Sequence, residues 1–243
     1  MNDYTSHREK VDKDGFTIID RIYSSKEINS IVEIIDGVDQ FNTNFRKTDD
    51  LFAIRRFLKY VPEVKEIIFS DKLKQIIHDL FGTGYFVVKS IYFDKPQKSN
   101  WFVAWHQDLT ISVDKKIDFD GYTNWTLKPN QYAVQPPVNI LQNNFTVRIH
   151  LDDTDKDNGA LNVIPGSHLK NIYKVENIDW SIEKEATCEV GVGGIMIMRP
   201  LLLHSSNRTL NNKKRRVVHI EFSNANLAKG MDWAEKEDCS VYS

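Results

Sequence analysis

The 243-residue sequence contains only two cysteines, Cys188 and Cys239, and their spacing matches neither a metal-binding motif nor a redox motif. A disulfide framework is therefore not expected, and a chain of this length does not need one to fold. No run of about 18 apolar residues is present, and no apolar segment follows a basic start. We therefore expect no transmembrane helix and no secretory signal, but a soluble, cytoplasmic protein.

An excess of charge of one sign is also missing. The chain has 32 basic and 34 acidic residues, with a formal net charge of −2. This balance provides no electrostatic footprint for nucleic acid or for an anionic membrane. The one basic run, Lys213 to Arg216, leads directly into a β-branched segment and is interpreted as a turn that enters a strand. The expected partner is a small molecule, and the sequence leaves the oligomeric state undetermined.

Hydrophobic residues make up 41% of the chain, which is enough for a packed core. A short strand is expected at residues 16–19, after the Asp14-Gly15 turn. A helix then follows a cap at Ser24 or Ser25 and ends near Gly37, because apolar residues recur there with helical spacing. Two further short helices are expected at residues 62–69 and 71–80. The first 84 residues are thus interpreted mainly as a helical support.

From residue 85 the pattern changes to short apolar runs separated by turns. This pattern is typical of an antiparallel sandwich or barrel rather than of alternating βαβ units. The runs lie at residues 85–88, 91–93, 102–105, 146–151, 161–164, 195–198 and 216–222. We predict a mainly β fold in a single domain spanning residues 1–243, with its β core at about residues 85–224.

Residues 109–145 separate two of these runs and are too many for an ordinary hairpin. Long connections in compact domains often form lids or binding loops, so this insertion is our candidate substrate cover. A decorative insertion packed on the outside of the domain is the alternative. The polar segment 152–159 has a composition similar to a calcium loop, but it lacks the central Gly and the final Glu of an EF-hand and is interpreted as a solvated turn.

The chemistry-bearing motif is His106-Gln107-Asp108, followed almost a hundred residues later by His204. On a strand, residues i and i+2 point to the same side, so His106 and Asp108 can share one face while Gln107 points away. Two imidazoles and one carboxylate suit a non-haem Fe(II) site with open coordination positions. A single histidine is usually structural, and it is the combination with His204 that favours a metal site.

Arg215 begins the strand that follows His204. Its planar, permanently charged guanidinium matches a carboxylate in a bidentate manner, and Ser206 can add a hydroxyl hydrogen bond. Arg215 is therefore a candidate for binding the far carboxylate of 2-oxoglutarate. Its neighbour Arg216 is the rival, because consecutive strand residues face opposite ways.

These segments resemble the phytanoyl-CoA dioxygenase family, a group of Fe(II)/2-oxoglutarate oxygenases that also contains ectoine hydroxylase. The most specific stretch is Asn-Gly-x-Leu-x-x-x-Pro-Gly-Ser-His at residues 158–168, and the resemblance covers residues 14–222. It implies a double-stranded β-helix (a jelly roll, cupin-like) in which His106, Asp108 and His204 hold the iron. Arg215, Ser206 and Ile91 match positions beside 2-oxoglutarate.

The resemblance also implies an activity, the hydroxylation of an unactivated C–H bond of a small molecule. Fe(II), 2-oxoglutarate and O2 would take part, and succinate and CO2 would be released. Arg148 stands where acyl-CoA hydroxylases of the family carry a Trp that lines the co-substrate pocket, so we count it among the co-substrate residues. This departure and the long insertion speak against an acyl-CoA substrate. Asp108 speaks against halogenation, because the related halogenases replace that carboxylate with a small residue.

The substrate itself is left open, with an amino-acid derivative, a secondary metabolite and a lipid acid as candidates. The insertion supplies aromatic walls and a cation, and further arginines offer anion contacts; the candidate substrate residues are Trp125, Lys128, Tyr132 and Arg55. Arg148 and His150 alternate with Val147 and Ile149. The pattern does not decide whether Arg148 and His150 face the pocket, with the two aliphatic residues outward, or face solvent while the aliphatic residues form the core. Two alternative functions are a non-catalytic jelly-roll binding protein and a cupin-like enzyme that uses another metal without 2-oxoglutarate.

Overall fold

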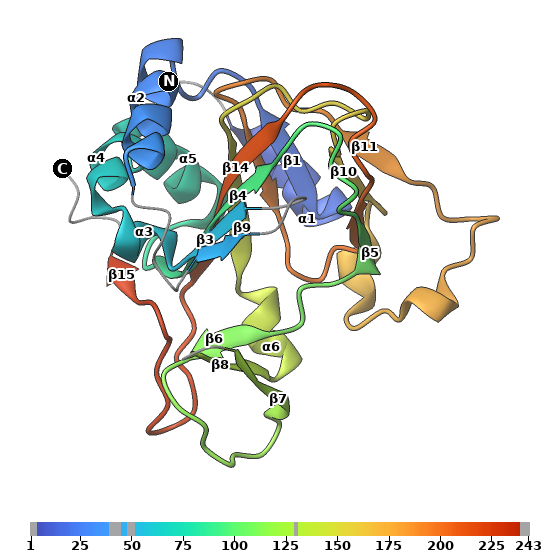
Figure 1. Ribbon diagram of the computed structural model, residues 1–243. Helices are drawn as coiled ribbons and strands as arrows, with labels where there is room; N and C mark the ends of the chain where they lie inside the picture. Colours follow the sequence, from blue (N-terminus) through green and yellow to red (C-terminus); the bar gives the residue numbers. More distant parts are fainter. Residues whose placement is uncertain (1–3, 39–44, 48–51, 129–130, 239–243) are drawn as a thin grey trace.

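The computed structural model of the chain describes residues 4–38, 45–47, 52–128 and 131–238, and for residues 45–47 and 128 the backbone alone (Figure 1). The fold is mainly β, and all strand pairs in its sheets are antiparallel. Among the described residues, no helix combines the length and the apolar character needed to cross a bilayer.

The main sheet has eight strands, and its central strand β14 pairs with β4 and β9. Its order is β1 (Phe16–Ile19), β12 (Ile195–Met198), β9 (Phe145–His150), β14 (Arg215–Ser223), β4 (Phe86–Lys95), β3 (Phe52–Arg55) and β2 (Phe45–Lys47), with β15 (Glu237–Asp238) paired to β4. Three strands of this sheet come from the first 84 residues. That region is therefore more than the helical support that the sequence predicted.

A second sheet of four short strands carries the His-x-Asp motif. Its order is β11 (Ala186–Cys188), β10 (Leu161–Val163), β13 (His204–Ser206) and β5 (Val103–His106). Side chains of this sheet and of the main sheet line one cavity, so the two sheets face each other as in a jelly roll without closing into a barrel. The predicted fold class is confirmed.

Helices cover the outer face of the main sheet (Figure 1). They are α1 (Thr5–Asp14), α2 (Ser25–Asp36), α3 (Phe57–Tyr60), α4 (Lys65–Ile68, preceded by a 3-10 turn at Pro62–Val64) and α5 (Asp71–Phe81). The predicted capping of α2 is confirmed: the Ser24 hydroxyl accepts from the Glu27 N–H, and the Glu27 carboxylate accepts from the Ser24 N–H at 2.7 Å. This reciprocal arrangement satisfies two N–H groups that the first helical turn leaves unpaired.

The outer face of the main sheet supplies the core beneath these helices. Val147 and Ile149 of β9 are fully buried there, together with Ile220 and Phe222 of β14. Arg148 and His150 point to the opposite face, between the two sheets. Each alternative left open by the sequence is therefore correct in part: Arg148 faces the cavity, and the aliphatic residues form the core. Strand β9 is covered on both of its faces.

The insertion at residues 109–145 forms a small lobe that projects from the end of the main sheet (Figure 1). It consists of a three-stranded sheet, β6 (Ile111–Val113), β8 (Gln131–Gln135) and β7 (Thr123–Lys128), followed by α6 (Val138–Gln142). The apolar core of the lobe, to which Val134 and Leu141 contribute, is shared with Val88 of β4, Leu201 and Trp233. The lobe is neither a structureless loop nor a purely exterior decoration, because residues of β6 and β8 line the cavity.

Two further short elements are the 3-10 turns at Ser167–Lys170 and Val175–Asn177, between β10 and β11. The first begins at Ser167, within the Pro-Gly-Ser-His stretch, and the His168 ring nitrogen lies 3.2 Å from the Asp12 carbonyl. His168 therefore ties this turn to the C-terminal end of α1, away from the cavity.

Candidate metal centre and co-substrate cavity

His106 and His204 are direct partners across the β5–β13 pair, and their ring centroids lie 4.2 Å apart. Each ring is oriented by a backbone carbonyl two residues earlier: Nδ1–H of His106 donates to Ala104 at 2.8 Å, and Nδ1–H of His204 donates to Leu202 at 2.9 Å. These bonds favour the tautomer in which both Nε2 atoms keep a free lone pair. The two Nε2 atoms are therefore available to one metal ion.

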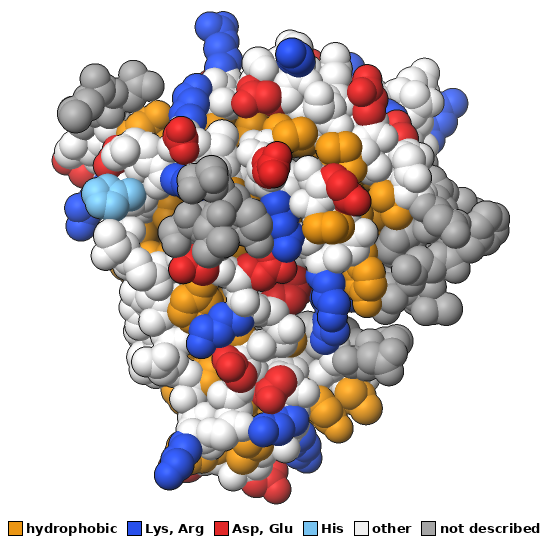
Figure 2. Space-filling view, turned by 90° about the vertical axis from the view of Figure 1, so that its left-hand side faces the viewer, with side chains coloured by type: hydrophobic (Ala, Val, Ile, Leu, Met, Phe, Trp, Pro, Cys, Tyr) orange, Lys and Arg blue, Asp and Glu red, His pale blue; other side chains and the backbone are white. Residues whose placement is uncertain are grey.

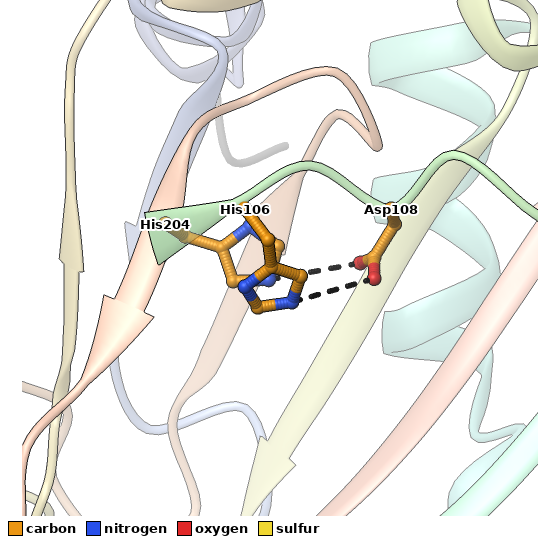
Figure 3. A group of neighbouring side chains, drawn as sticks. All are labelled: His106, Asp108 and His204. Carbon is orange, nitrogen blue, oxygen red and sulfur yellow. Dashed lines mark ion pairs between the residues drawn. The ribbon is translucent and has the colours of Figure 1, made fainter. Parts of the chain in front are cut away.

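The Asp108 carboxylate completes the group (Figure 3). Its Oδ1 lies 3.9 Å from Nε2 of His106, and its Oδ2 lies 3.8 Å from Nε2 of His204. One ligand atom from each residue can be chosen so that all lie within 4.8 Å of one another. Two imidazoles and a carboxylate at such spacing match the facial arrangement of a non-haem iron site.

Gln107 holds the two ligands of this motif in place. Its side chain points away from the metal ligands, as the alternation of the strand predicted. The amide nitrogen donates to the carbonyls of Asn171 and Leu201, and its oxygen accepts from the Tyr173 N–H at 2.8 Å. Asp108 is also fixed through its backbone, because its N–H donates to Pro200 at 2.9 Å.

The charge states of these groups suit a divalent metal. Burial lowers the pKa of His204 to about 4, so its imidazole is neutral near pH 7. Burial alone would raise the pKa of Asp108, but the attraction of His204, Lys89 and other basic groups outweighs it and holds that pKa below its ordinary value. The site thus offers a neutral imidazole and an ionised carboxylate, which are the forms that bind metals.

These three side chains lie at the wall of a cavity of about 390 Å³ between the two sheets. Arg215, Arg148 and Ile91 of the main sheet line it, together with Ser206 of β13. The predicted co-substrate residues are therefore brought together around one space. Ser206 donates to the Gly159 carbonyl at 2.9 Å.

Gly159 belongs to the stretch that carried the family resemblance, and its backbone explains why glycine stands there. It has a φ of 89°, and a Cβ atom would lie only 2.7 Å from Nζ of Lys95. A larger residue would be strained by its backbone conformation and would also displace the lysine. This turn therefore packs directly behind Ser206.

Arg215 and Arg216 have opposite surroundings. Arg216 points away from the cavity and forms a bidentate pair with Asp152, at 2.9 Å and 2.7 Å. Arg215 is only 3% exposed and lines the cavity, and its Nε and Nη1 have no hydrogen-bond partner. Burial lowers the pKa of Arg215 to about 9, a destabilisation that a bound anion would relieve. The geometry therefore favours Arg215 over Arg216 as an anion-binding group.

A chain of hydrogen bonds crosses the inner face of the main sheet beside Asp108. Nζ of Lys89 donates to Glu221 at 2.6 Å, and the same carboxylate oxygen lies 3.1 Å from Nε2 of His219. Nη1 of Arg148 lies 3.1 Å from Nδ1 of His219. From the sequence, no function was assigned to His219, Lys89 or Glu221. The feature that could have indicated them is that they are polar residues within the apolar runs of strands β4 and β14.

The predicted substrate residues are only partly brought to the cavity. Arg55 lines it, whereas Trp125 and Tyr132 do not. Those two rings instead lie edge to face at 6.5 Å and pack against the core of the small lobe, because they stand on the other side of the β7–β8 hairpin. Gln131 and Ala133 are the residues of β8 that line the cavity. The side chain of Lys128 lies outside the described residues.

A comparison with protein families provides the decisive observation. The profile of the phytanoyl-CoA dioxygenase (PhyH) family matches residues 11–217, which is most of the chain. The chain belongs to the phytanoyl-CoA dioxygenase family. The resemblance predicted from the His-x-Asp motif and residues 158–168 is thereby confirmed.

Among curated proteins, a probable alpha-ketoglutarate-dependent hypophosphite dioxygenase of Stutzerimonas stutzeri is 25% identical over 186 residues. The match covers 71% of this chain and 56% of that protein, so the chain spans little more than half the length of this relative.

Solved structures of low sequence identity share the fold. The non-haem alpha-ketoglutarate-dependent carbocyclase SnoK from nogalamycin biosynthesis has a TM-score of 0.70 at 15% identity, over 93% of this chain and 85% of SnoK. The epimerase SnoN, in complex with Fe3+, alpha-ketoglutarate and nogalamycin RO, has a TM-score of 0.68 at 12% identity, over 96% of this chain and 93% of SnoN.

Proposed function

We propose that this protein is an Fe(II)- and 2-oxoglutarate-dependent dioxygenase that hydroxylates an unactivated C–H bond of a small molecule. The observation that carries the proposal is the pairing of two features in one cavity. His106, Asp108 and His204 form a compact group of metal-ligand atoms at its wall, and Arg215 lines the same cavity with unpartnered nitrogens. A metal and a dicarboxylate fit these two features together.

The residues present fit Fe(II). Two Nε2 lone pairs and a carboxylate oxygen come from one side, as a facial set of ligands requires, and they leave the cavity side open. When bound, the iron and 2-oxoglutarate supply the activation of O2, with release of succinate and CO2. One oxygen atom of O2 enters succinate and the other converts the substrate C–H into C–OH.

The side chains of this chain perform binding, orientation and exclusion of water. His106, Asp108 and His204 hold the iron, and Gln107 keeps the first two in register. Arg215 binds the carboxylate of 2-oxoglutarate that lies far from the metal, and Ser206 stands beside it. Ile91, Val103 and Leu161 give the cavity apolar wall, which limits the access of water to the reacting atoms.

A second candidate is oxidation of a P–H bond in a small phosphorus oxyanion. The name of the Stutzerimonas stutzeri relative supports it, and so do the basic side chains around the cavity, among them Arg56, Lys89 and Arg148. The chemistry balances in the same way, because P–H becomes P–OH while 2-oxoglutarate becomes succinate and CO2. Incubation with hypophosphite and measurement of phosphite distinguishes this candidate from C–H hydroxylation.

The test of the proposed activity is succinate formation from 2-oxoglutarate by the purified protein with Fe(II) and O2. We expect slow succinate formation that is abolished by His106→Ala, Asp108→Ala or His204→Ala and strongly reduced by Arg215→Gln. Equal succinate formation by the wild type and all three ligand variants would exclude the assignment. In that case a binding protein, or an enzyme that uses another metal, would be the better account.

A further inference from the structure

Arg148 is a buried cation that the proposed function does not fully explain. Its side chain is 7% exposed and lines the cavity, and its Nε has no hydrogen-bond partner. Burial lowers its pKa to about 10, although the Asp108 carboxylate nearby acts in the opposite direction. A guanidinium in such a place is costly unless an anion contacts it.

The partner of Arg148 on the sheet does not supply that anion. The Glu221 carboxylate takes the Nε2–H of His219, so the Nδ1 of His219 is left to accept from Arg148. Burial lowers the pKa of His219, and the ring is therefore neutral. The chain from Lys89 through Glu221 and His219 thus orients Arg148 but does not place a carboxylate against it.

Strand register separates Arg148 from the predicted co-substrate anchor. Arg148 pairs with His219, and Arg215 stands four residues earlier on the same strand β14. Four residues of a strand span roughly 13 Å, and both side chains face the cavity. The two guanidiniums therefore start from backbone positions well apart on the sheet, and the cavity has room for an anion at Arg148 besides the one at Arg215.

The end of the cavity away from Arg215 is basic and polar. Residues of β3, β4 and the small lobe meet there, and they include Arg55, Arg56, Lys89, Ser112 and Gln131. Arg56 has a left-handed backbone (φ 52°, ψ 45°), which breaks the alternation of β3, so Arg55 and Arg56 both line the same space. Strained backbone of this kind is often found at binding sites.

The side-chain charges around the cavity do not cancel, even if Arg55 and the groups that it contacts are not counted. Four cations stand against three carboxylates among the other described lining residues and the residues that their side chains hydrogen-bond: Arg56, Lys89, Arg148 and Arg215 against Asp108, Glu221 and Glu235. A divalent metal and the 2-oxoglutarate dianion cancel each other, so at least one positive charge is left. On the outer face drawn in Figure 2, by contrast, basic and acidic side chains are intermixed.

We propose that the substrate is a small oxyanion, such as a carboxylate or a phosphorus oxyacid, and that Arg148 contacts its charged group at the end of the cavity away from Arg215. This inference rests on the proposed function, because it assumes that the metal and 2-oxoglutarate occupy the other end. A neutral substrate would leave Arg148 without an anion in direct contact, since Asp108 compensates its charge only in part. The preformed Lys89–Glu221–His219 chain keeps that guanidinium in position before the substrate arrives.

The test uses the full chain loaded with Ni(II), a redox-inert metal, and saturated with 2-oxoglutarate. Methylphosphonate and its neutral dimethyl ester, which has two more methyl groups, are titrated by calorimetry at constant ionic strength. We expect saturable binding of one methylphosphonate per chain and no binding of the ester. Arg148→Gln should lower the affinity for methylphosphonate at least tenfold, and Arg148→Lys should lower it less. Arg8→Gln, a substitution of an exposed residue on α1, should not change the affinity.

Other outcomes overturn the inference in distinguishable ways. Equal binding of the ester, or unchanged methylphosphonate affinity in a folded Arg148→Gln protein, would refute it. If Arg148→Gln weakened 2-oxoglutarate while the wild type bound no methylphosphonate, Arg148 would serve the co-substrate, and the proposed function would stand without the inference. If the wild type bound neither Ni(II) nor 2-oxoglutarate, the proposed function would fail as well.

Discussion

The imidazole of His106 faces that of His204 across one antiparallel strand pair, with ring centroids 4.2 Å apart. Strand pairing, rather than proximity in sequence, therefore creates the metal-ligand group. Asp108 joins it because the chain leaves β5 after His106 and is immediately fixed by the side chain of Gln107 and by its own N–H. The ligand geometry thus depends on the stability of two short strands.

Replacement of Gln107 should weaken metal binding although it removes no ligand. Gln107→Ala breaks hydrogen bonds to Asn171, Leu201 and Tyr173, so His106 and Asp108 lose their support. We expect a roughly 10- to 100-fold loss of Fe(II) or Ni(II) affinity, as is usual for residues that orient metal ligands. The measurement is a calorimetric titration of the protein with the metal. Gln142→Ala, the control, removes an exposed hydrogen bond to the Asn171 side chain and should leave the metal affinity unchanged.

Two adjacent arginines provide a matched test of the co-substrate position. Arg215→Gln should weaken the binding of 2-oxoglutarate by about 2 kcal/mol, or roughly 30-fold in affinity, because hydrogen bonds to a charged group are lost. Arg216→Gln should leave 2-oxoglutarate affinity unchanged but lower the free energy of unfolding by about 1–2 kcal/mol, since it breaks the pair with Asp152. The reverse pattern would identify Arg216 as the anchor.

The free energy of unfolding of the metal-free protein should decrease as the pH is lowered below about 6.5. Burial, together with Arg148 and Arg215, lowers the pKa of His150 well below its ordinary value of 6.5. Between the two values the unfolded chain binds a proton at this residue that the folded chain does not, so the free energy of unfolding rises with pH there. The contribution is complete above pH 6.5 and is lost progressively as the pH falls.

His150→Gln isolates this effect from that of the other histidines. Urea denaturation of the wild type at pH 7 and pH 5.5 should show a loss of stability that is larger than that of the variant by about 1 kcal/mol. The same pH dependence in both proteins would mean that His150 is protonated in the folded state as well.

Sequence patterns predicted those helices and strands in which the apolar residues recur with the regular period of the element. Helix α2, with its cap at Ser24, and strand β9 were recognised because their apolar residues repeat with the expected period. Strand β4 was predicted as two runs, since Lys89 and Ser90 interrupt it. Both residues are polar because they line the cavity or bond neighbouring groups, which a one-dimensional pattern does not reveal.

The candidate site was predictable only in part, for a similar reason. His106, Asp108, His204 and Arg215 stand in recognisable motifs, and the structure brings them to one cavity. Trp125 and Tyr132 were assigned to the substrate from composition alone, but they face the core of the small lobe. Helix α1 was not predicted, because Val11 is its only buried residue.

The account depends most directly on the joint binding of Fe(II) and 2-oxoglutarate at His106, Asp108 and His204. The measurement is an anaerobic titration of the metal-free protein with Fe(II) and then 2-oxoglutarate, monitored by visible absorption. We predict the weak charge-transfer band of chelated Fe(II) in the wild type, its loss in His204→Ala, and a shift to higher 2-oxoglutarate concentration in Arg215→Gln. Absence of the band in folded wild-type protein, or its persistence in His204→Ala, would contradict the account.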